Sequence, residues 1–494
     1  MRRAIGIIPA GLALAVLWAG SSIDPAVSFP PLALAERLVR LAPGDAATFF
    51  IDALGYNAVR LLALGTTMAF LAFGALLPRL PERFPPWGAG LIFGAAAAGA
   101  TLGAPMRPRA AWAVLGGAAA AVLYAVPLAW LVDLTETDDA PGDRGRRRAL
   151  LLIGSAAAAM AAGGTTLGRI GRRLAGPRTD VAISAPDVMP TAPARPPFPR
   201  IPGLSPEVTS TADHYVVDID LVDPVVEVEG WSLAIGGLVE RPALFTFFDL
   251  QRRFRIVEEH SVLTCISNPV GGPLVGSSSW TGVRLRDVLS MVVPRDGAQD
   301  VVFRCADGYV DSLTLEAAME PSVLLAVAQN GRPLTWQHGF PCRLRAPAFY
   351  GVKNVKWLEE IEIVGFDARG YWTRRGWSER AKVRTQSRIE TSFTDARAGE
   401  PMWIAGTAWA GTRGVSRVEV SVDGGRVWKE AVLNPPLSRL AWTQWAYRWT
   451  PPTPGRYLVR CRATDGEGIL QDATERPPHP SGASGYHSEQ VMVR

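Results

Sequence analysis

The chain has 494 residues, of which 48% are hydrophobic and 20% charged, and its formal net charge is +5 at pH 7. That length exceeds what one hydrophobic core usually serves, so a single-domain protein is excluded and two or three domains are expected. Because the positive charge is in small excess, we expect no nucleic-acid partner.

The composition changes near residue 176. Up to that point the chain is rich in Ala, Leu and Gly and contains no lysine, whereas the later part alternates in polarity and carries most of the tryptophan. The stretch from Ala185 to Pro199 is too proline-rich for a helix or an inner strand. We predict a membrane region, a linker, an α+β domain and an all-β domain over residues 1–175, 176–205, 206–378 and 379–494.

Five apolar segments in the first part approach the roughly 20 residues that cross a bilayer. They lie near residues 4–20, 61–77, 87–102, 110–132 and 149–167. The first follows Arg2 and Arg3 and has a second interpretation as a cleaved signal peptide. Between the first two segments, residues 31–57 mix apolar and charged side chains, which predicts helices at the membrane surface. The fold class predicted for this part is an α-helical, multi-pass membrane region.

The side of the membrane on which the soluble part lies depends on these segments, since an odd number of spans places the two chain ends on opposite sides of the membrane. The flanking arginines divide evenly between the two sides, so the positive-inside rule does not decide the orientation. Arg146 to Arg148 precede a small-residue segment, either as an ordinary helix flank or as a sequence similar to a twin-arginine export signal, which carries folded domains. We expect a cell-membrane protein with its soluble part on the extracytoplasmic side.

The five histidines all lie beyond the linker, at His214, His260, His338, His479 and His487. No histidine pair is therefore available to hold a haem between the apolar helices, and we expect no haem there. The spans then anchor the soluble part or bind a partner. A quinone site, which needs no histidine, is also open.

The two later domains differ in pattern. Residues 221–239, 301–304 and 361–364 read as strands, and residues 249–254 and 284–291 as short helices, which is an α+β pattern. Beyond residue 400, short alternating strands stand between Gly and Pro turns, which predicts a β-sandwich. Those strands lie near residues 402–406, 418–422, 442–449 and 457–462.

The residues from Thr264 to Gly272 place one thiol at the end of a strand, followed at once by proline and glycine. Gly271 and Gly272 let a bulky group approach the backbone closely. A Cys265 thiolate in that position is a soft ligand that suits a transition metal. On composition alone, a buried structural cysteine is the simpler interpretation.

Two further segments follow in order, one from Trp336 to Leu344 (WQHGFPCRL) and one from Ala348 to Trp357 (AFYGVKNVKW). With the cysteine segment they resemble the sulfite oxidase family of molybdenum-cofactor enzymes. The resemblance implies that Cys265 coordinates molybdenum and that the later segments contact molybdopterin and its phosphate, for which cationic side chains are suited. The cofactor-binding residues so implied are His338, Arg343, Lys353, Asn354, Val355, Lys356, Ser267 and Asn268.

Several of these residues have a plainer interpretation. A lone histidine before Gly-Phe-Pro is often a turn residue held by one hydrogen bond, and this applies to His338. Cys305 and Cys342 either form a disulfide or are, like Cys461, small buried hydrophobes. Because Cys265 must stay free to bind metal, two disulfides are not expected.

The β-sandwich resembles the immunoglobulin-like dimerisation domain of the same family, through its Ser-Val-Asp-Gly-Gly turn at residues 421–425, and this implies a homodimer. The family's Arg-Asn-His stretch, which helps bind sulfite, is replaced here by residues 209–215, without arginine. Anion binding would then rest on Arg343, Arg374 or Arg375. No cytochrome b5-like domain or CxxCH haem site is present, so a separate cytochrome or quinone-linked electron partner is expected.

These features predict a membrane-anchored molybdenum-cofactor oxidoreductase. It would exchange one oxygen atom, with two electrons, with a small sulfur- or nitrogen-containing substrate. The alternative is a cofactor-free, membrane-tethered binding protein that retains the sulfite oxidase fold. A transporter is a further alternative, against which the lack of charges inside the apolar segments argues.

Overall fold

A computed structural model describes residues 6–23, 28–42, 50, 57–79, 85–102, 110–136, 181–191, 193–194, 196–219 and 223–494. The chain divides into two compact units. The first comprises Met1–Arg178 and Ile219–Val225, and the second comprises Thr179–Asp218 and Val226–Arg494.

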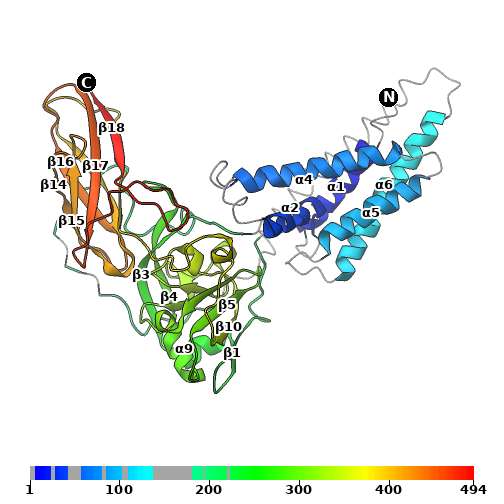
Figure 1. Cartoon of the computed structure of the whole chain (residues 1–494), viewed down its shortest axis with the longest axis horizontal. Coiled ribbons are helices and arrows are strands. Elements are labelled where there is room, and N and C mark those ends of the chain that lie inside the picture. Colours follow the sequence, from blue (N-terminus) through cyan, green and yellow to red (C-terminus); the bar gives the residue numbers. More distant parts are fainter. Residues whose placement is uncertain are drawn as a thin grey trace. The chain divides into compact units, whose positions relative to one another are not determined.

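The first unit is a helical bundle (Figure 1). Its described helices are α1 (Ile7–Ile23), α2 (Pro30–Leu41), α4 (Asn57–Leu76), α5 (Pro86–Thr101) and α6 (Ala110–Glu136), with the short η2 (Leu77–Arg79). Small residues let these helices approach closely, because a Cβ added at Gly94 would lie 2.4 Å from the carbonyl oxygen of Gly117. The Tyr124 hydroxyl, buried between helices, donates to the Gly74 carbonyl at 2.5 Å.

Helices α1, α4, α5 and α6 coincide with four of the five predicted apolar segments, and α2 falls where surface helices were expected. The fifth segment, near residues 149–167, lies outside the described residues. Among the residues that the structure describes, one helix is long and apolar enough to cross a membrane, over Ala113–Val132. Ile7–Ser21 and Arg60–Leu76 are shorter apolar helices. The helical prediction is confirmed for these segments, and the multi-pass arrangement stays a prediction.

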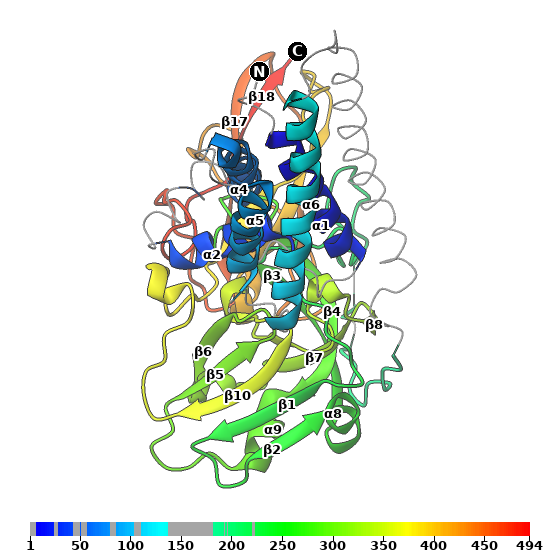
Figure 2. The same ribbon diagram turned by 90° about the vertical axis from the view of Figure 1, so that its right-hand side faces the viewer.

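The second unit contains a five-stranded sheet in the order β2-β1-β10-β5-β6 (Figure 2). β1 pairs with β10 in parallel, and the other neighbours are antiparallel. The strands are β1 (Ser232–Gly237), β2 (Ala243–Thr246), β5 (Asp300–Cys305), β6 (Val310–Thr314) and β10 (Leu358–Val364). Helices follow three strands of this unit, namely α8 (Phe247–Arg253), α9 (Leu285–Val292) and α10 (Leu315–Ala318).

A second sheet carries the cysteine segment. Its strands are β3 (Ile256–Thr264), β4 (Val275–Arg284), β7 (Leu324–Gln329) and β8 (Arg332–Pro333) in that order, and β9 (Arg343–Arg345) pairs with β7. Thr264 on β3 stands opposite Val275 on β4. The loop 265–274 is therefore the connection of a β-hairpin, which fixes both of its ends on one buried sheet.

Most predicted elements of this domain are present, and one is misplaced. The predicted helices correspond to α8 and α9, and the predicted strands at 301–304 and 361–364 to β5 and β10. A strand pair over residues 221–239 was wrong for residues 223–231, which form no strand. Trp231, directly before β1, donates from its indole to the carbonyl oxygen of Leu358 on β10 at 2.9 Å, a contact distant in sequence that local alternation does not predict.

The C-terminal domain is a β-sandwich of two four-stranded sheets. One contains β11 (Gln386–Ile389), β12 (Met402–Trp409), β16 (Thr443–Trp449) and β15 (Val432–Asn434). The other contains β14 (Lys429–Glu430), β13 (Val415–Ser421), β17 (Gly455–Asp465) and β18 (Ser488–Val493). Both sheets contribute to one core, since Ile404 and Trp445 pack in the same cluster as Val418, Val459 and Cys461. The predicted sandwich is confirmed.

Candidate functional site

Cys265 is the first residue after β3 and is only 7% exposed. Its N–H donates to the carbonyl oxygen of Leu274 at 2.9 Å, and the Leu274 N–H donates to Asn268 Oδ1 at 2.9 Å. The loop therefore closes on itself and holds the thiol in place. Sγ lies 3.0 Å from Ser267 Oγ. Burial raises the pKa of the Cys265 thiol, against hydrogen bonding by Ser267, so the free thiol is protonated until a metal displaces the proton.

The Tyr215 hydroxyl lies close to Cys265. A Cβ built on Gly351 would stand 3.0 Å from this hydroxyl and 3.7 Å from Cys265 Cα, so both border the same glycine. Burial raises the pKa of Tyr215, and Cys265 adds to the rise. The hydroxyl and His214 Nε2 are both buried without a hydrogen-bond partner within the described part of the chain. Buried polar atoms without partners in a well-packed domain indicate a place for a ligand.

Arg343 and Arg345 project from β9 onto the ring of Trp280, with guanidinium carbons 5.1 and 4.6 Å from its centroid. Burial lowers the pKa of Arg343 to about 10 and that of Arg345 to about 9, so both remain charged at pH 7. Arg343 donates to the carbonyl oxygens of His338 and Asn354 at 2.9 and 3.1 Å. Over the described ranges, neither arginine forms an ion pair with a carboxylate, and both Nε atoms lack an acceptor.

His338 lies within the same cluster and is 4% exposed. Its Nε2 is 3.0 Å from the carbonyl oxygen of Thr211, and its ring centroid is 5.6 Å from that of His214. Burial, with the charge of Arg343, lowers the pKa of His338 to about 4, and burial lowers that of His214 to about 3. Both rings are therefore neutral at pH 7. The single hydrogen bond matches the turn-residue interpretation of His338, and its contact with a cofactor stays a prediction.

The two lysines of the last segment already have carboxylate partners. Lys353 Nζ lies 2.6 Å from Asp311 Oδ1, and Lys356 forms an ion pair with Asp218. Lys356 also donates to the carbonyl oxygen of Gln337 at 2.8 Å. The positive charge near Tyr215 that forms no ion pair with a carboxylate of the described residues therefore comes from β9. Cofactor binding by either lysine stays a prediction.

Asn354 and Val355 support β9 from behind. Asn354 Oδ1 accepts from the Ala346 N–H at 2.7 Å and from the Arg345 guanidinium, and its Nδ2 donates to the carbonyl oxygen of Tyr350 at 2.9 Å. The carbonyl oxygen of Val355 accepts from the Leu344 N–H at 2.9 Å. Both residues thereby position the arginines, and direct contact with a cofactor stays a prediction for each.

The structure places Ser267 beside the Cys265 sulfur, and it places His338 and Arg343 in contact with each other. It adds His214, which lies beside His338, and Tyr215, whose hydroxyl is near Cys265 and within electrostatic range of Arg343 and Arg345. Cofactor binding by the predicted residues stays a prediction. Arg345 could have been found from the spacing Arg-x-Arg, because residues i and i+2 of a strand share a face. His214 and Tyr215 lie in an irregular segment, and their position depends on contacts distant in sequence. No local sequence pattern predicts that position.

An anionic group that has several acceptor oxygens and carries a transition metal fits this set of residues. Two buried guanidinium groups and a tyrosine hydroxyl provide donors that the described residues do not satisfy, and one thiol provides a soft ligand. The Nε atoms of the two buried arginines have no acceptor in the described part of the chain, and an anion would complete the site there.

Comparison with known proteins agrees with this chemistry. Residues 220–372 match the family described as oxidoreductase molybdopterin binding domain, and residues 381–471 match the Mo-co oxidoreductase dimerisation domain. Residues 220–372 are a molybdopterin-binding domain of the sulfite oxidase and nitrate reductase family. A dimerisation domain of the same family follows it.

Two relatives illustrate the family. The chain is 30% identical to a nitrate reductase of Hordeum vulgare over 299 residues, covering 49% of this chain and 33% of that protein. It is 32% identical to the mitochondrial sulfite oxidase of Mus musculus over 237 residues, covering 41% of this chain and 43% of that protein. The chain therefore spans less than half the length of these relatives.

A solved structure shares the fold of the second unit. The sulfane dehydrogenase SoxCD of Paracoccus pantotrophus aligns with a TM-score of 0.51 and 22% identity, covering 58% of this chain and 82% of that chain. At that identity the likeness establishes the fold of the molybdopterin-binding domain.

All four cysteines are free and buried, so Cys305 and Cys342 form no disulfide.

Proposed function

We propose that this protein is a membrane-anchored molybdenum-cofactor oxidoreductase that exchanges one oxygen atom, with two electrons, with a small sulfur- or nitrogen-containing substrate. One observation carries the proposal. The Cys265 thiol, the free hydroxyl of Tyr215 and two buried arginines without carboxylate partners meet in the domain that matches the molybdopterin-binding family. Each of these groups has a use in holding a metal bound to an anionic pterin.

Cys265 is the metal ligand in this proposal, and Ser267 fixes its orientation through the 3.0 Å contact with the sulfur. Arg343 and Arg345 would neutralise the anionic cofactor, and the Tyr215 hydroxyl would donate a hydrogen bond to it. When bound, the molybdenum cofactor supplies the two-electron oxygen-atom transfer. The protein binds, orients and shields the reacting group from water.

The substrate class follows from the charge of the pocket. Two buried arginines favour an anionic or strongly polar oxygen acceptor or donor over an apolar one. Arg375 is engaged elsewhere, since its guanidinium carbon lies 3.6 Å from the centroid of the Tyr371 ring and it donates to the Tyr371 carbonyl at 3.0 Å. Of the three predicted candidates for anion binding, Arg343 is buried, whereas Arg374 is exposed and Arg375 half-buried, so a charge-assisted contact is best shielded from water at Arg343.

The proposal places the first unit in the cell membrane and the second on its extracytoplasmic side. Support comes from the apolar helix over Ala113–Val132 and from the arginine-rich sequence at residues 146–148. Two further partners belong to the proposal. A second copy of the chain would bind through the dimerisation domain, and a separate cytochrome or quinone-linked protein would carry electrons.

The test begins with elemental and pterin analysis of the full chain purified in detergent, which should contain molybdenum and pterin in near-equal amounts. Cys265→Ser should abolish oxygen-atom transfer with the fold intact by circular dichroism. Cys305→Ser is the matched control, because both thiols are 7% exposed and lie in the same domain. A wild-type chain that takes up no molybdenum would instead favour the cofactor-free binding protein, and full activity of Cys265→Ser would refute the ligand assignment.

A further inference from the structure

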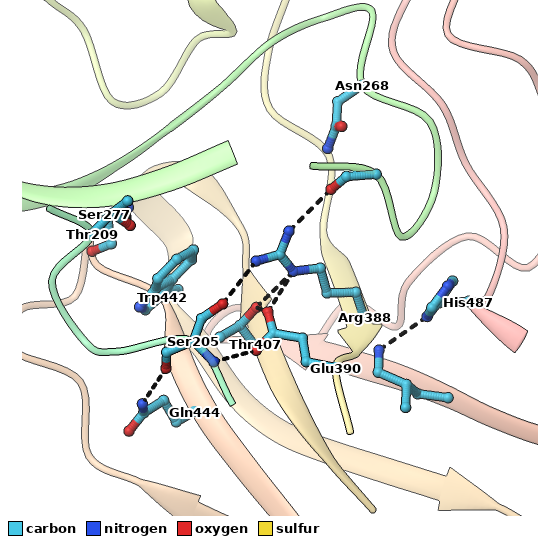
Figure 3. A network of polar contacts seen from close by, with 12 residues as sticks. Ser205, Thr209, Asn268, Ser277, Arg388, Glu390, Thr407, Trp442, Gln444 and His487 are labelled. Carbon is cyan, nitrogen blue, oxygen red and sulfur yellow. Dashed lines mark hydrogen bonds and ion pairs between the residues drawn. The ribbon is translucent and has the colours of Figure 1, made fainter. Parts of the chain in front are cut away.

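The loop that carries Cys265 is held from the C-terminal domain. Arg388, on strand β11 of the sandwich, donates from Nη1 to the carbonyl oxygen of Gly272 at 3.0 Å (Figure 3). Gly272 belongs to the hairpin connection 265–274, whose first residue is Cys265. A buried guanidinium of one domain therefore contacts the loop that presents the thiol in the other.

The same guanidinium holds a second segment that leads to the site. Arg388 Nη2 donates to Ser205 Oγ at 3.3 Å, and the Ser205 N–H donates to Glu390 Oε2 at 2.8 Å. Gln444 Nε2 donates to the carbonyl oxygen of Ser205 at 2.7 Å (Figure 3). From Ser205 the chain continues to Tyr215, whose hydroxyl lies near Cys265.

Arg388 is itself fixed in direction. Its Nε lies 2.6 Å from Glu390 Oε1 and donates to Thr407 Oγ1 at 3.2 Å, and its side chain and that of Glu390 are 11% and 9% exposed. One edge of the planar guanidinium thus contacts Glu390. Its other two nitrogens donate to Gly272, in the Cys265 loop, and to Ser205, in the segment that leads to Tyr215. An ammonium group cannot do this, because it lacks the fixed fork of donors.

His487 provides a second contact with the cysteine loop. Its Nδ1 accepts from the Ile389 N–H at 3.0 Å, which fixes the ring (Figure 3). A Cβ added at Gly271 would lie 2.2 Å from the ring atoms Cδ2 and Nε2. The imidazole therefore packs directly on the backbone of Gly271, one residue before the carbonyl that Arg388 binds.

We propose that Arg388 and His487 of the C-terminal domain are positioning residues that hold the Cys265 loop and the segment leading to Tyr215 in the geometry needed for cofactor binding. The inference rests on the proposed function, because it takes Cys265 to be the metal ligand. The C-terminal domain is then part of the active site, in addition to its role in dimerisation. Separation of the two domains would release the thiol from its fixed position.

The experiment measures the accessibility of Cys265 in the full chain, purified in detergent from cells that make no molybdenum cofactor. Alkylation by iodoacetamide is followed at each cysteine by peptide mass spectrometry, with Cys461, buried in the core of the sandwich, as internal reference. Arg388→Lys and Arg388→Ala should each raise the rate at Cys265 about tenfold or more relative to Cys461, because a loop that opens locally exposes its own thiol first.

Arg462 offers a matched control in the same domain. Its Nε donates to Glu419 Oε2 at 2.9 Å and its guanidinium carbon lies 4.2 Å from the Trp428 ring centroid. Arg462→Lys and Arg462→Ala should leave the ratio of rates as in the wild type. Arg388→Lys answers the question even if Arg388→Ala does not fold, since it keeps a cation beside Glu390.

Three results would overturn the proposal: an unchanged ratio in the Arg388 variants, a parallel rise at Cys461, which reports general unfolding, or an equal rise in the Arg462 variants. The measurement needs no bound molybdenum. A failure of the molybdenum assignment, detected by metal analysis of the wild type, is therefore distinguishable from a failure of this inference.

Discussion

The ammonium group of Lys353 lies 2.6 Å from Asp311 Oδ1, and the two side chains are 4% and 2% exposed. Lys353 also donates to the carbonyl oxygen of Ser312 at 2.9 Å, and the Tyr309 hydroxyl donates to Asp311 at 3.0 Å. The pair joins η4 (Gly351–Lys353) to β6. Because a buried charge needs a partner, this contact stabilises the segment that follows Tyr350.

Asp311→Asn should therefore destabilise the molecule strongly, by about 3 to 5 kcal/mol, since Lys353 would keep a buried charge without a carboxylate. Denaturant midpoints followed by tryptophan fluorescence measure the loss. The double variant with Lys353→Met should recover a large part of it. Glu362→Gln is the control, because Glu362 pairs with Arg304 at 2.6 Å on the surface, where removal costs about 1 kcal/mol or less. Equal losses in both single variants would contradict the prediction.

Arg343→Ala should lower the cofactor content of the purified chain. The loss of a charge-assisted contact with a phosphate or pterin oxygen is on the order of 1.5 to 3 kcal/mol. Arg345→Ala should act in the same direction, because both guanidinium groups lie on the ring of Trp280. Molybdenum content per chain is the measurement.

A different result would assign Arg343 to the substrate. If the variant keeps its full molybdenum content and only the Michaelis constant rises, Arg343 contacts the substrate instead of the cofactor. Arg343 would then supply the positive charge of the arginine that is missing from residues 209–215.

Local patterns predicted the parts of the molecule that local physics determines. Four of the predicted apolar segments are helices in the described part of the chain, and β3 ends at Thr264, before Pro269, Gly271 and Gly272, where the sequence indicated. Cys265 follows that strand as expected. The residues that determine these features are neighbours in the chain, so a local sequence pattern is enough to predict them.

The remaining features depend on partners far away in sequence. Lys353 and Lys356 were predicted to bind the cofactor, but each already pairs with a carboxylate, Asp311 or Asp218, which no spacing rule links to it. Arg388 was not considered, since its role requires the position of Gly272 in the other domain. Side-chain charge is visible in a sequence, whereas its neutralisation is a property of the fold.

The detergent-purified chain should contain no haem bound by its residues 1–176. Haem between helices is commonly held by axial histidines, and the first histidine of the sequence is His214. The visible spectrum, recorded after removal of copurifying cytochromes, should therefore lack a Soret band. A strong band that stays with the chain would show this expectation to be wrong, and pyridine haemochrome analysis would then identify the haem type.

The stability of the cofactor-free chain should depend on His214 in mildly acidic solution. Burial, followed by the charges of His338, Arg343 and Arg345, lowers the pKa of His214 from 6.5 to about 3. Between these values the unfolded chain binds a proton that the folded chain does not, so the free energy of unfolding decreases as the pH falls from about 6.5 toward about 3. Above pH 6.5 this contribution is constant.

His214→Asn should therefore reduce the fall in denaturant midpoint between about pH 7 and about pH 5, compared with the wild type. Tyr215→Phe is the matched control. It removes a buried hydroxyl from the neighbouring residue, but the pKa of Tyr215 is raised above its usual value of 10.0, so it does not titrate in this range. The control should keep the wild-type slope. A His214→Asn chain with an unchanged slope would mean that the imidazole is protonated in the folded protein as readily as in the unfolded one, which its burial between Trp280, His338 and the β9 arginines argues against.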